Sequence, residues 1–93
     1  MKLAAARLAA REIAEGIVEG RVDPFDGATI IWKRLLEDLD EPIPDDLWPF
    51  KSNASAIEDC IFEAERSGSN YDALIARCRQ EIVDAARALI ESK

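Results

Sequence analysis

Residues 20–32 read GRVDPFDGATIIW, and they predict the place where one helix ends and the next begins. Gly20 follows an apolar periodic run, at a position where glycine can end a helix in the left-handed conformation. Asp23 stands at an N-cap position, with Pro24 at the first helical position and Asp26 at the capping-box position. The stretch therefore predicts a tight junction between two helices, and it places Trp32 in the core of the second.

Gly27 is the one residue of this junction that helix capping does not explain. Glycine inside a first helical turn costs about 0.5–1 kcal/mol relative to alanine, so another requirement must favour it. Either another part of the chain packs closely there or a ligand approaches, and we favour close packing. A calcium loop is not expected, because the alternating oxygen ligands and the closing glutamate of an EF-hand are missing.

Outward from the junction, apolar side chains recur at helical spacing, and no convincing period-two run predicts a strand. We expect four helices: from about Leu3 to Glu19, from Pro24 to about Leu39, from a cap at Ser52 or Asn53 to Gly68, and from a capping box at Ser69 and Asp72 onward. Two prolines, Pro42 and Pro44, break the chain between the second and third helices, and a short turn with Leu47, Trp48 and Phe50 follows. The sequence predicts a single all-α domain over residues 1–93, a compact and mostly antiparallel four-helix bundle with a proline-rich acidic break.

Composition limits both the compartment and the chemistry. No unbroken apolar run approaches the roughly 18–20 residues that cross a bilayer, and charges interrupt the N-terminal apolar stretch before it resembles a signal peptide. We therefore expect a cytoplasmic protein. Histidine is absent, which removes the commonest general base and excludes a Ser-His or Cys-His nucleophile. Cys60 and Cys78 lie in apolar stripes without zinc or disulfide spacing, so we interpret them as small core residues and expect a non-enzymatic protein without a cofactor.

The negative charge is concentrated in the middle of the chain. Residues 35–72 carry two basic and eleven acidic side chains, a balance of −9, whereas the segments on either side each carry a balance of +1. A net charge of −7 disfavours nucleic acid and anionic membranes as partners, because binding to phosphate requires lysine or arginine. The natural partner of such a surface is a basic protein.

Two pairs of carboxylates have the spacing found in all-helical, magnesium-dependent nucleotide pyrophosphatases. These pairs are Glu12 with Glu15, and Glu81 with Asp84. Carboxylates three residues apart on facing helices can hold a hard cation and a triphosphate. The residues between the members of each pair are apolar and are predicted to face the core, so the carboxylates should point to solvent. We therefore favour solvated helix faces and expect no metal site.

An acidic segment followed by aromatic residues is the strongest candidate for a binding surface. Six acids occur between residues 37 and 46 without one basic residue, and Trp48 and Phe50 follow directly. Aromatic anchors beside a rim of one charge sign are typical of interfaces that attract an oppositely charged partner and then bind it. The alternative is that both aromatics close the open end of the bundle. The candidate partner-binding residues are Glu37, Asp38, Asp40, Glu41, Asp45, Asp46, Trp48 and Phe50.

The spacing G-x-x-D-P-x-x-G-A-x-x-I-W, from Gly20 to Trp32, resembles a motif in small uncharacterised bacterial proteins of about this length. The similarity continues more loosely through Phe50 and into the alanine- and leucine-rich last helix. No activity is established for that family. The resemblance therefore implies a coherent natural domain and assigns no functional residue.

Taken together, these patterns predict a protein-interaction module, in its sharpest form an inhibitor or immunity-type protein that covers the basic nucleic-acid site of a toxin. A second hypothesis is a structural homo-oligomer in which Leu8, Ile30 and Phe62 form a self-interface. A third is the magnesium-dependent pyrophosphatase, which requires the paired carboxylates to face inward.

Overall fold

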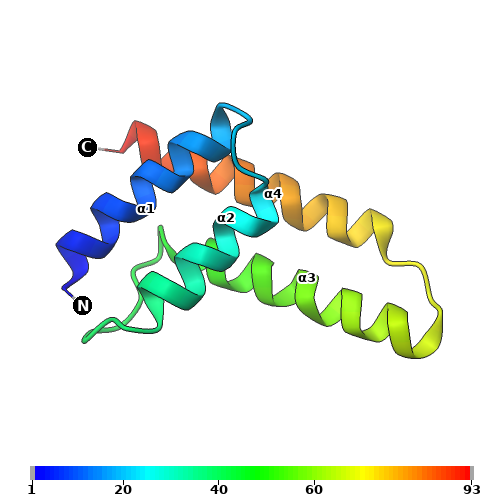
Figure 1. Cartoon of the computed structure of the whole chain (residues 1–93). Coiled ribbons are helices and arrows are strands. Elements are labelled where there is room, and N and C mark those ends of the chain that lie inside the picture. The colour runs from blue at the N-terminus through cyan, green and yellow to red at the C-terminus, as the bar shows by residue number, and fades with distance from the viewer. Residues whose placement is uncertain (1, 93) are drawn as a thin grey trace.

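The computed structural model describes residues 2–92, and these form helices joined by short connections, without a strand. In chain order the elements are α1 (Leu3–Val18), α2 (Pro24–Ile30), the π-helical segment η1 (Ile31–Leu36), α3 (Trp48–Ser67) and α4 (Asp72–Glu91). Because α2 runs directly into η1, the two form one continuous helix, and the molecule is a four-helix bundle (Figure 1). The predicted fold class is confirmed.

The last helix holds the bundle together, because α4 packs against both α1 and α3 while α2 lies across α3 and α4. The α1 side also secures the end of α4: the Arg11 guanidinium donates to the carbonyl oxygens of Ile90, at 3.1 Å, and of Ser92, at 2.6 Å. A basic group at this position satisfies carbonyls that have no partner within the helix. Within residues 2–92, no helix combines the length and the apolar character that a bilayer span requires.

The predicted junction between the first two helices is confirmed. Gly20 has a φ of 82°, which only glycine adopts readily, and it follows the last turn of α1. The Asp23 carboxylate accepts a hydrogen bond from the backbone N–H of Asp26 at 3.1 Å, and Pro24 occupies the first turn of α2. Local capping rules thus place the start of α2 correctly.

Gly27 is explained by close packing, as favoured from the sequence. A Cβ atom at this position would lie 2.7 Å from Ile17 Cδ1, 2.9 Å from Ile17 Cγ1 and 3.1 Å from Val22 Cγ1. Ile17 is buried, so its side chain has little room to move aside. Glycine is therefore required where α2 crosses the end of α1.

Two predicted helix starts are wrong. The third helix begins at Trp48, not at Ser52 or Asn53, because Pro49 lies in the first turn, where its missing N–H costs no hydrogen bond. The segment predicted as a separate turn is therefore the first turn of α3. The Ser69–Asp72 capping box does not form. The Asp72 backbone N–H donates instead to Asn70 Oδ1, at 2.8 Å.

The second helix widens into a π-helix, which changes the residues that face the core. The Glu37 N–H donates to the Trp32 carbonyl oxygen, five residues back, at 3.1 Å. Ile31 and Leu35 are buried, whereas Trp32, predicted as core, is only partly buried at the edge of the hydrophobic cluster. Its indole N–H has no hydrogen-bond partner among the described residues.

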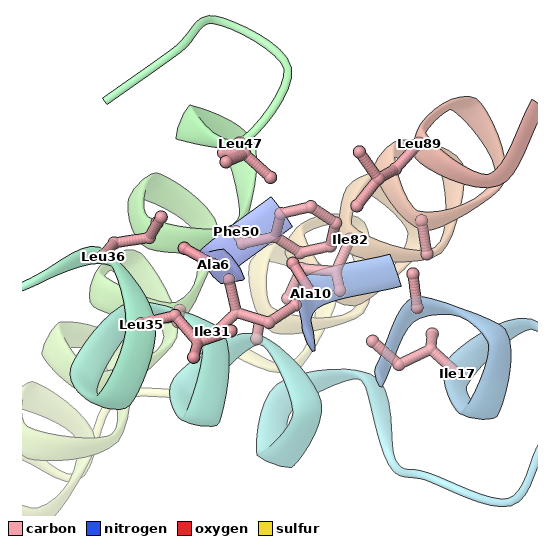
Figure 2. Close-up of a cluster of buried hydrophobic side chains, with 14 of the residues drawn as sticks. Ala6, Ala10, Ile17, Ile31, Leu35, Leu36, Leu47, Phe50, Ile82 and Leu89 are labelled. Carbon is pink, nitrogen blue, oxygen red and sulfur yellow. The ribbon is translucent and has the colours of Figure 1, made fainter. Parts of the chain in front are cut away.

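The core lies where all four helices meet. Three alanines of α1 are fully buried and let this helix approach its neighbours closely, while larger side chains from the other elements fill the centre. Phe50 points into the middle of this cluster, with Leu47 and Ile82 around it (Figure 2). The largest fully buried side chains are Phe50, Ile31, Leu47, Ile57, Ile82 and Leu89.

The hairpin of α3 and α4 extends beyond the other helices (Figure 1). Its covered part contains all the buried residues of these two helices, the last of α3 being Cys60 and the first of α4 being Cys78. Between them, residues 61–77 contain no buried side chain. We call residues 61–77 the hairpin tip, and residues 48–60 together with 78–91 the hairpin root.

Candidate functional site

The acidic segment, residues 37–46, forms an ordered connection between η1 and α3. Leu39 and Ile43 pack against the hydrophobic core and anchor the segment, while all six of its carboxylates are exposed. One of them, Asp46, pairs with Arg7 of α1. The segment therefore presents its charge to solvent from a fixed position at one end of the bundle.

Trp48 is held outward by its buried neighbours. Leu47 and Phe50 are fully buried, whereas Trp48 is 49% exposed. The backbone N–H groups of Leu47 and Trp48 both donate to the Pro44 carbonyl oxygen at 3.0 Å, which fixes the turn that leads into α3. A large aromatic side chain is thus displayed on a rigid helix end directly after the acidic segment.

Phe50 does not belong to this surface. It was predicted beside Trp48 as a partner-binding residue, but its fully buried ring lies in the core. Helical spacing explains the difference, because Phe50 lies seven residues before the buried Ile57 and so faces the same way. Trp48 lies nine residues before Ile57 and faces the opposite way. The bundle-closing interpretation therefore holds for Phe50, whereas Trp48 has the exposure that a binding residue requires.

The Trp48 ring already interacts with a cation. The Lys51 ammonium lies 5.3 Å from the centroid of the indole ring, one turn along α3. Such contacts are favourable because the negative face of the ring attracts positive charge. The ring of Trp48 is thus suited to receive a basic side chain. Lys51 is not among the predicted site residues, although its i, i+3 spacing from Trp48 indicates such a contact on a helix.

A groove beside Trp48 was also missed from the sequence. It runs between the first turns of α3 and the second half of α4, and its lining residues are Pro49, Ser52, Asn53, Glu81, Asp84 and Ala85. Glu81 and Asp84 were considered as one half of a metal site. Across the groove, Glu81 and Asp84 face residues of α3. The spacing of residues within α4 alone does not reveal this arrangement.

The two carboxylate pairs do not meet. Glu12 and Glu15 are exposed on α1, and Glu81 and Asp84 are exposed on α4. Across residues 2–92, no three acidic, cysteine or histidine side chains come together in a way that would hold a metal ion. The pairs lie on outward faces, as the apolar residues between their members indicate.

Asp23 has a second role that its capping position did not reveal. Its carboxylate accepts two hydrogen bonds from the Arg79 guanidinium of α4, with 3.2 Å between Nη1 and Oδ2, and a second bond from Nη2 to Oδ1. The Arg79 hydrogen bonds lower the pKa of Asp23. Burial opposes them with a smaller effect, and the hydrogen bond from the Asp26 N–H lowers the pKa further. This ion pair holds the start of α2 on α4.

The cysteines behave as core residues. Cys60 and Cys78 are both buried and free. Burial raises the pKa of the Cys78 thiol, and the nearby negative charge of Glu81 raises it further. A thiol with a raised pKa is a poor nucleophile at neutral pH, so neither the position nor the electrostatics favours a catalytic role.

The residues proposed for a self-interface are exposed but spread over three helices. Leu8 lies on α1, Ile30 on α2 and Phe62 on the hairpin tip. Phe62 has the strongest apolar surroundings, because Ile61 and Leu74 of the tip are exposed as well. The acidic surface at Trp48 and the apolar tip therefore lie at opposite ends of α3.

No protein-family model, curated protein or solved structure matches this chain. The functional inference consequently rests on the residues and their geometry.

Proposed function

We propose that this protein is a non-enzymatic interaction module that binds a basic protein through Trp48 and the acidic segment. The observation that carries the proposal is the exposure of Trp48 close to the fully buried Leu47 and Phe50, next to six exposed carboxylates. An exposed tryptophan on a rigid backbone binds at a low entropic cost, and tryptophan is enriched among residues that dominate binding energy. The surrounding negative charge attracts a positively charged partner and raises the association rate. An inhibitor or immunity-type protein fits this arrangement.

Capture from a lysate of the native cell, read by mass spectrometry, tests the proposal when variants are compared. Trp48→Ala removes the aromatic anchor, and Glu41→Lys with Asp45→Lys reverses two exposed charges while leaving the Arg7–Asp46 pair intact. Glu12→Lys with Glu15→Lys is the matched control, since it changes the net charge equally at exposed positions of α1, outside the acidic segment. We expect one or more basic proteins to be retained by the wild type and the control, and lost with either site variant.

Binding kinetics with the captured protein then separate the contribution of Trp48 from that of the acidic segment. Charge reversal in the acidic segment should lower the association rate at least tenfold at low salt, whereas Trp48→Ala should mainly raise the dissociation rate. Circular dichroism should show the same helix content in every variant. Retention of the same proteins by all variants, or retention of acidic proteins only, would contradict the proposal.

Self-association is the second candidate, favoured by the hairpin tip. Ile61, Phe62 and Leu74 are 40%, 58% and 44% exposed there, and a second copy is one way to cover them. A dimer formed through the tip would become more stable as the protein concentration rises. Sedimentation at increasing concentration distinguishes this candidate from a monomeric interaction module.

A further inference from the structure

The groove beside Trp48 is continuous with the proposed interaction surface. Its α3 wall begins at Pro49, the residue after Trp48, and includes Ser52, which lies one turn beyond Trp48 on the same helix face. Trp48 is not itself a lining residue, but it directly precedes this wall along the chain and lies one turn from Ser52.

A buried amide supplies the first acceptor of the groove. Asn53 is only 7% exposed, and its Nδ2 donates to the Pro49 carbonyl oxygen at 2.9 Å. Because a carbonyl oxygen only accepts, this bond fixes the orientation of the amide and leaves Oδ1 for another donor. No described residue donates to Oδ1. A nearly buried polar side chain in the wall of the groove thus has an unused acceptor.

The opposite wall carries negative charge. Glu81 and Asp84 are exposed there, one turn apart on α4. Asp84 accepts one hydrogen bond from Gln80 Nε2 at 3.0 Å, and Glu81 Oε1 lies 3.7 Å from Arg77 Nε. An ionised carboxylate offers about four lone-pair sites, so both groups keep acceptor capacity. No lysine or arginine of the described chain lines the groove.

We propose that this groove binds an arginine side chain of the basic partner. The inference rests on the proposed function and names the group that the partner presents. A guanidinium has five donors in one plane, pairs with carboxylates through two parallel hydrogen bonds and stacks on aromatic rings. These properties match the acceptors of Asn53, Glu81 and Asp84 and the aromatic face of Trp48. A lysine ammonium is a compact charge and matches fewer of them.

The first test uses the purified protein and a small probe, N-acetyl-arginine methylamide, followed by ¹⁵N NMR. Saturable shifts are expected for the Asn53 side-chain amide and for the backbone amides of Ser52, Glu81 and Asp84. The lysine analogue should bind several-fold more weakly. Glu81→Gln with Asp84→Asn should weaken arginine binding at least tenfold. Glu12→Gln with Glu15→Gln removes the same charge from a carboxylate pair of similar spacing that does not line this groove, and should leave binding unchanged.

Three results would overturn the inference: no saturable shift in the wild type, equal weakening in both double variants, or stronger shifts of the same amides with magnesium chloride than with the arginine probe. The captured partner gives a separate test. If the Glu41 and Asp45 reversal abolishes partner binding but Glu81→Gln with Asp84→Asn does not, the groove inference fails and the proposed function stands. If partner binding survives every variant, the proposed function fails as well.

Discussion

The root and the tip of the α3–α4 hairpin carry similar apolar stripes but lie in different environments. In the root, Ile57 and Ile82 face the α1 and α2 layer and are buried. In the tip, Ile61 continues the stripe of Ile57 by one turn and Leu74 continues that of Ile82 by two turns, and both are exposed. The difference comes from the covering layer, which ends before the tip begins (Figure 1). Burial in this molecule is therefore decided by helix length as much as by side-chain pattern.

The comparison predicts opposite outcomes for one substitution at the two ends of α3. Phe50→Ala in the root should lower the free energy of unfolding by about 3–5 kcal/mol, because a fully buried ring leaves a cavity in a close-packed core. Phe62→Ala in the tip should change it by less than about 1 kcal/mol, since the ring is largely exposed and loses mainly its contact with Arg66. Urea unfolding followed by circular dichroism measures both values.

Two controls support this comparison. Phe50→Leu keeps an apolar side chain and should lower the free energy of unfolding by about 1–1.5 kcal/mol. This variant still tests the burial of residue 50 if Phe50→Ala does not fold. Repeating the Phe62→Ala measurement at two protein concentrations shows whether a second copy covers the tip. Similar losses for Phe50→Ala and Phe62→Ala in a concentration-independent measurement would contradict the distinction between root and tip.

Gly27 tests how tightly the layer that covers the root is packed. Gly27→Ala should lower the free energy of unfolding by about 1–2 kcal/mol although alanine is the better helix former, because the new methyl group meets the buried Ile17. Ile17→Val removes Cδ1, the atom at 2.7 Å, so the same glycine substitution should cost less in that background. Thermal and urea unfolding of the four variants form a double-mutant cycle. If the two substitutions lower the free energy of unfolding by strictly additive amounts, the contact with Ile17 does not explain why residue 27 is glycine.

The features predictable from the sequence are the ones that depend on local chain chemistry. Gly20, Asp23 and Pro24 act within a few residues of their own position, so capping rules place the junction correctly. The apolar stripe of α1 also follows from periodicity, whereas in the second helix the π-helical segment moves Trp32 to the edge of the core. Phe50 was misassigned because the start of α3 was placed after it. Extending the stripe of Ile57 backwards by seven residues would have placed Phe50 inside.

The misplaced helix start also concealed the hairpin tip. At about 1.5 Å per residue, the 20 residues of α3 span about 30 Å, whereas the 7 residues of α2 and the 6 of η1 span about 20 Å. With the expected helix lengths, the second and third helices are nearly equal, so those lengths give no sign of an uncovered hairpin end. The Asp23–Arg79 pair and the groove at Asn53 depend on how distant segments meet, which no local pattern specifies.

The Asp23–Arg79 pair marks the boundary between root and tip, because Arg79 follows the first buried residue of α4. Asp23→Asn retains an N-cap but loses the charge of the carboxylate. At pH 7 it should lower the free energy of unfolding by less than about 1 kcal/mol, because the side chains of Asp23 and Arg79 are both more than one-third exposed. Arg79 lowers the pKa of Asp23 in the folded protein, so this stabilisation is present above the ordinary value of 3.8 and is lost as the pH falls through the lowered pKa. The difference between the wild type and Asp23→Asn, measured by urea unfolding, should therefore narrow as the pH is lowered from 7 through 3.8. Arg79→Gln should lower the free energy of unfolding by a similar amount, and it should lower it little further when combined with Asp23→Asn. If the difference between the wild type and Asp23→Asn stays constant with pH, the capping hydrogen bond, rather than the ion pair, holds α2 at this boundary.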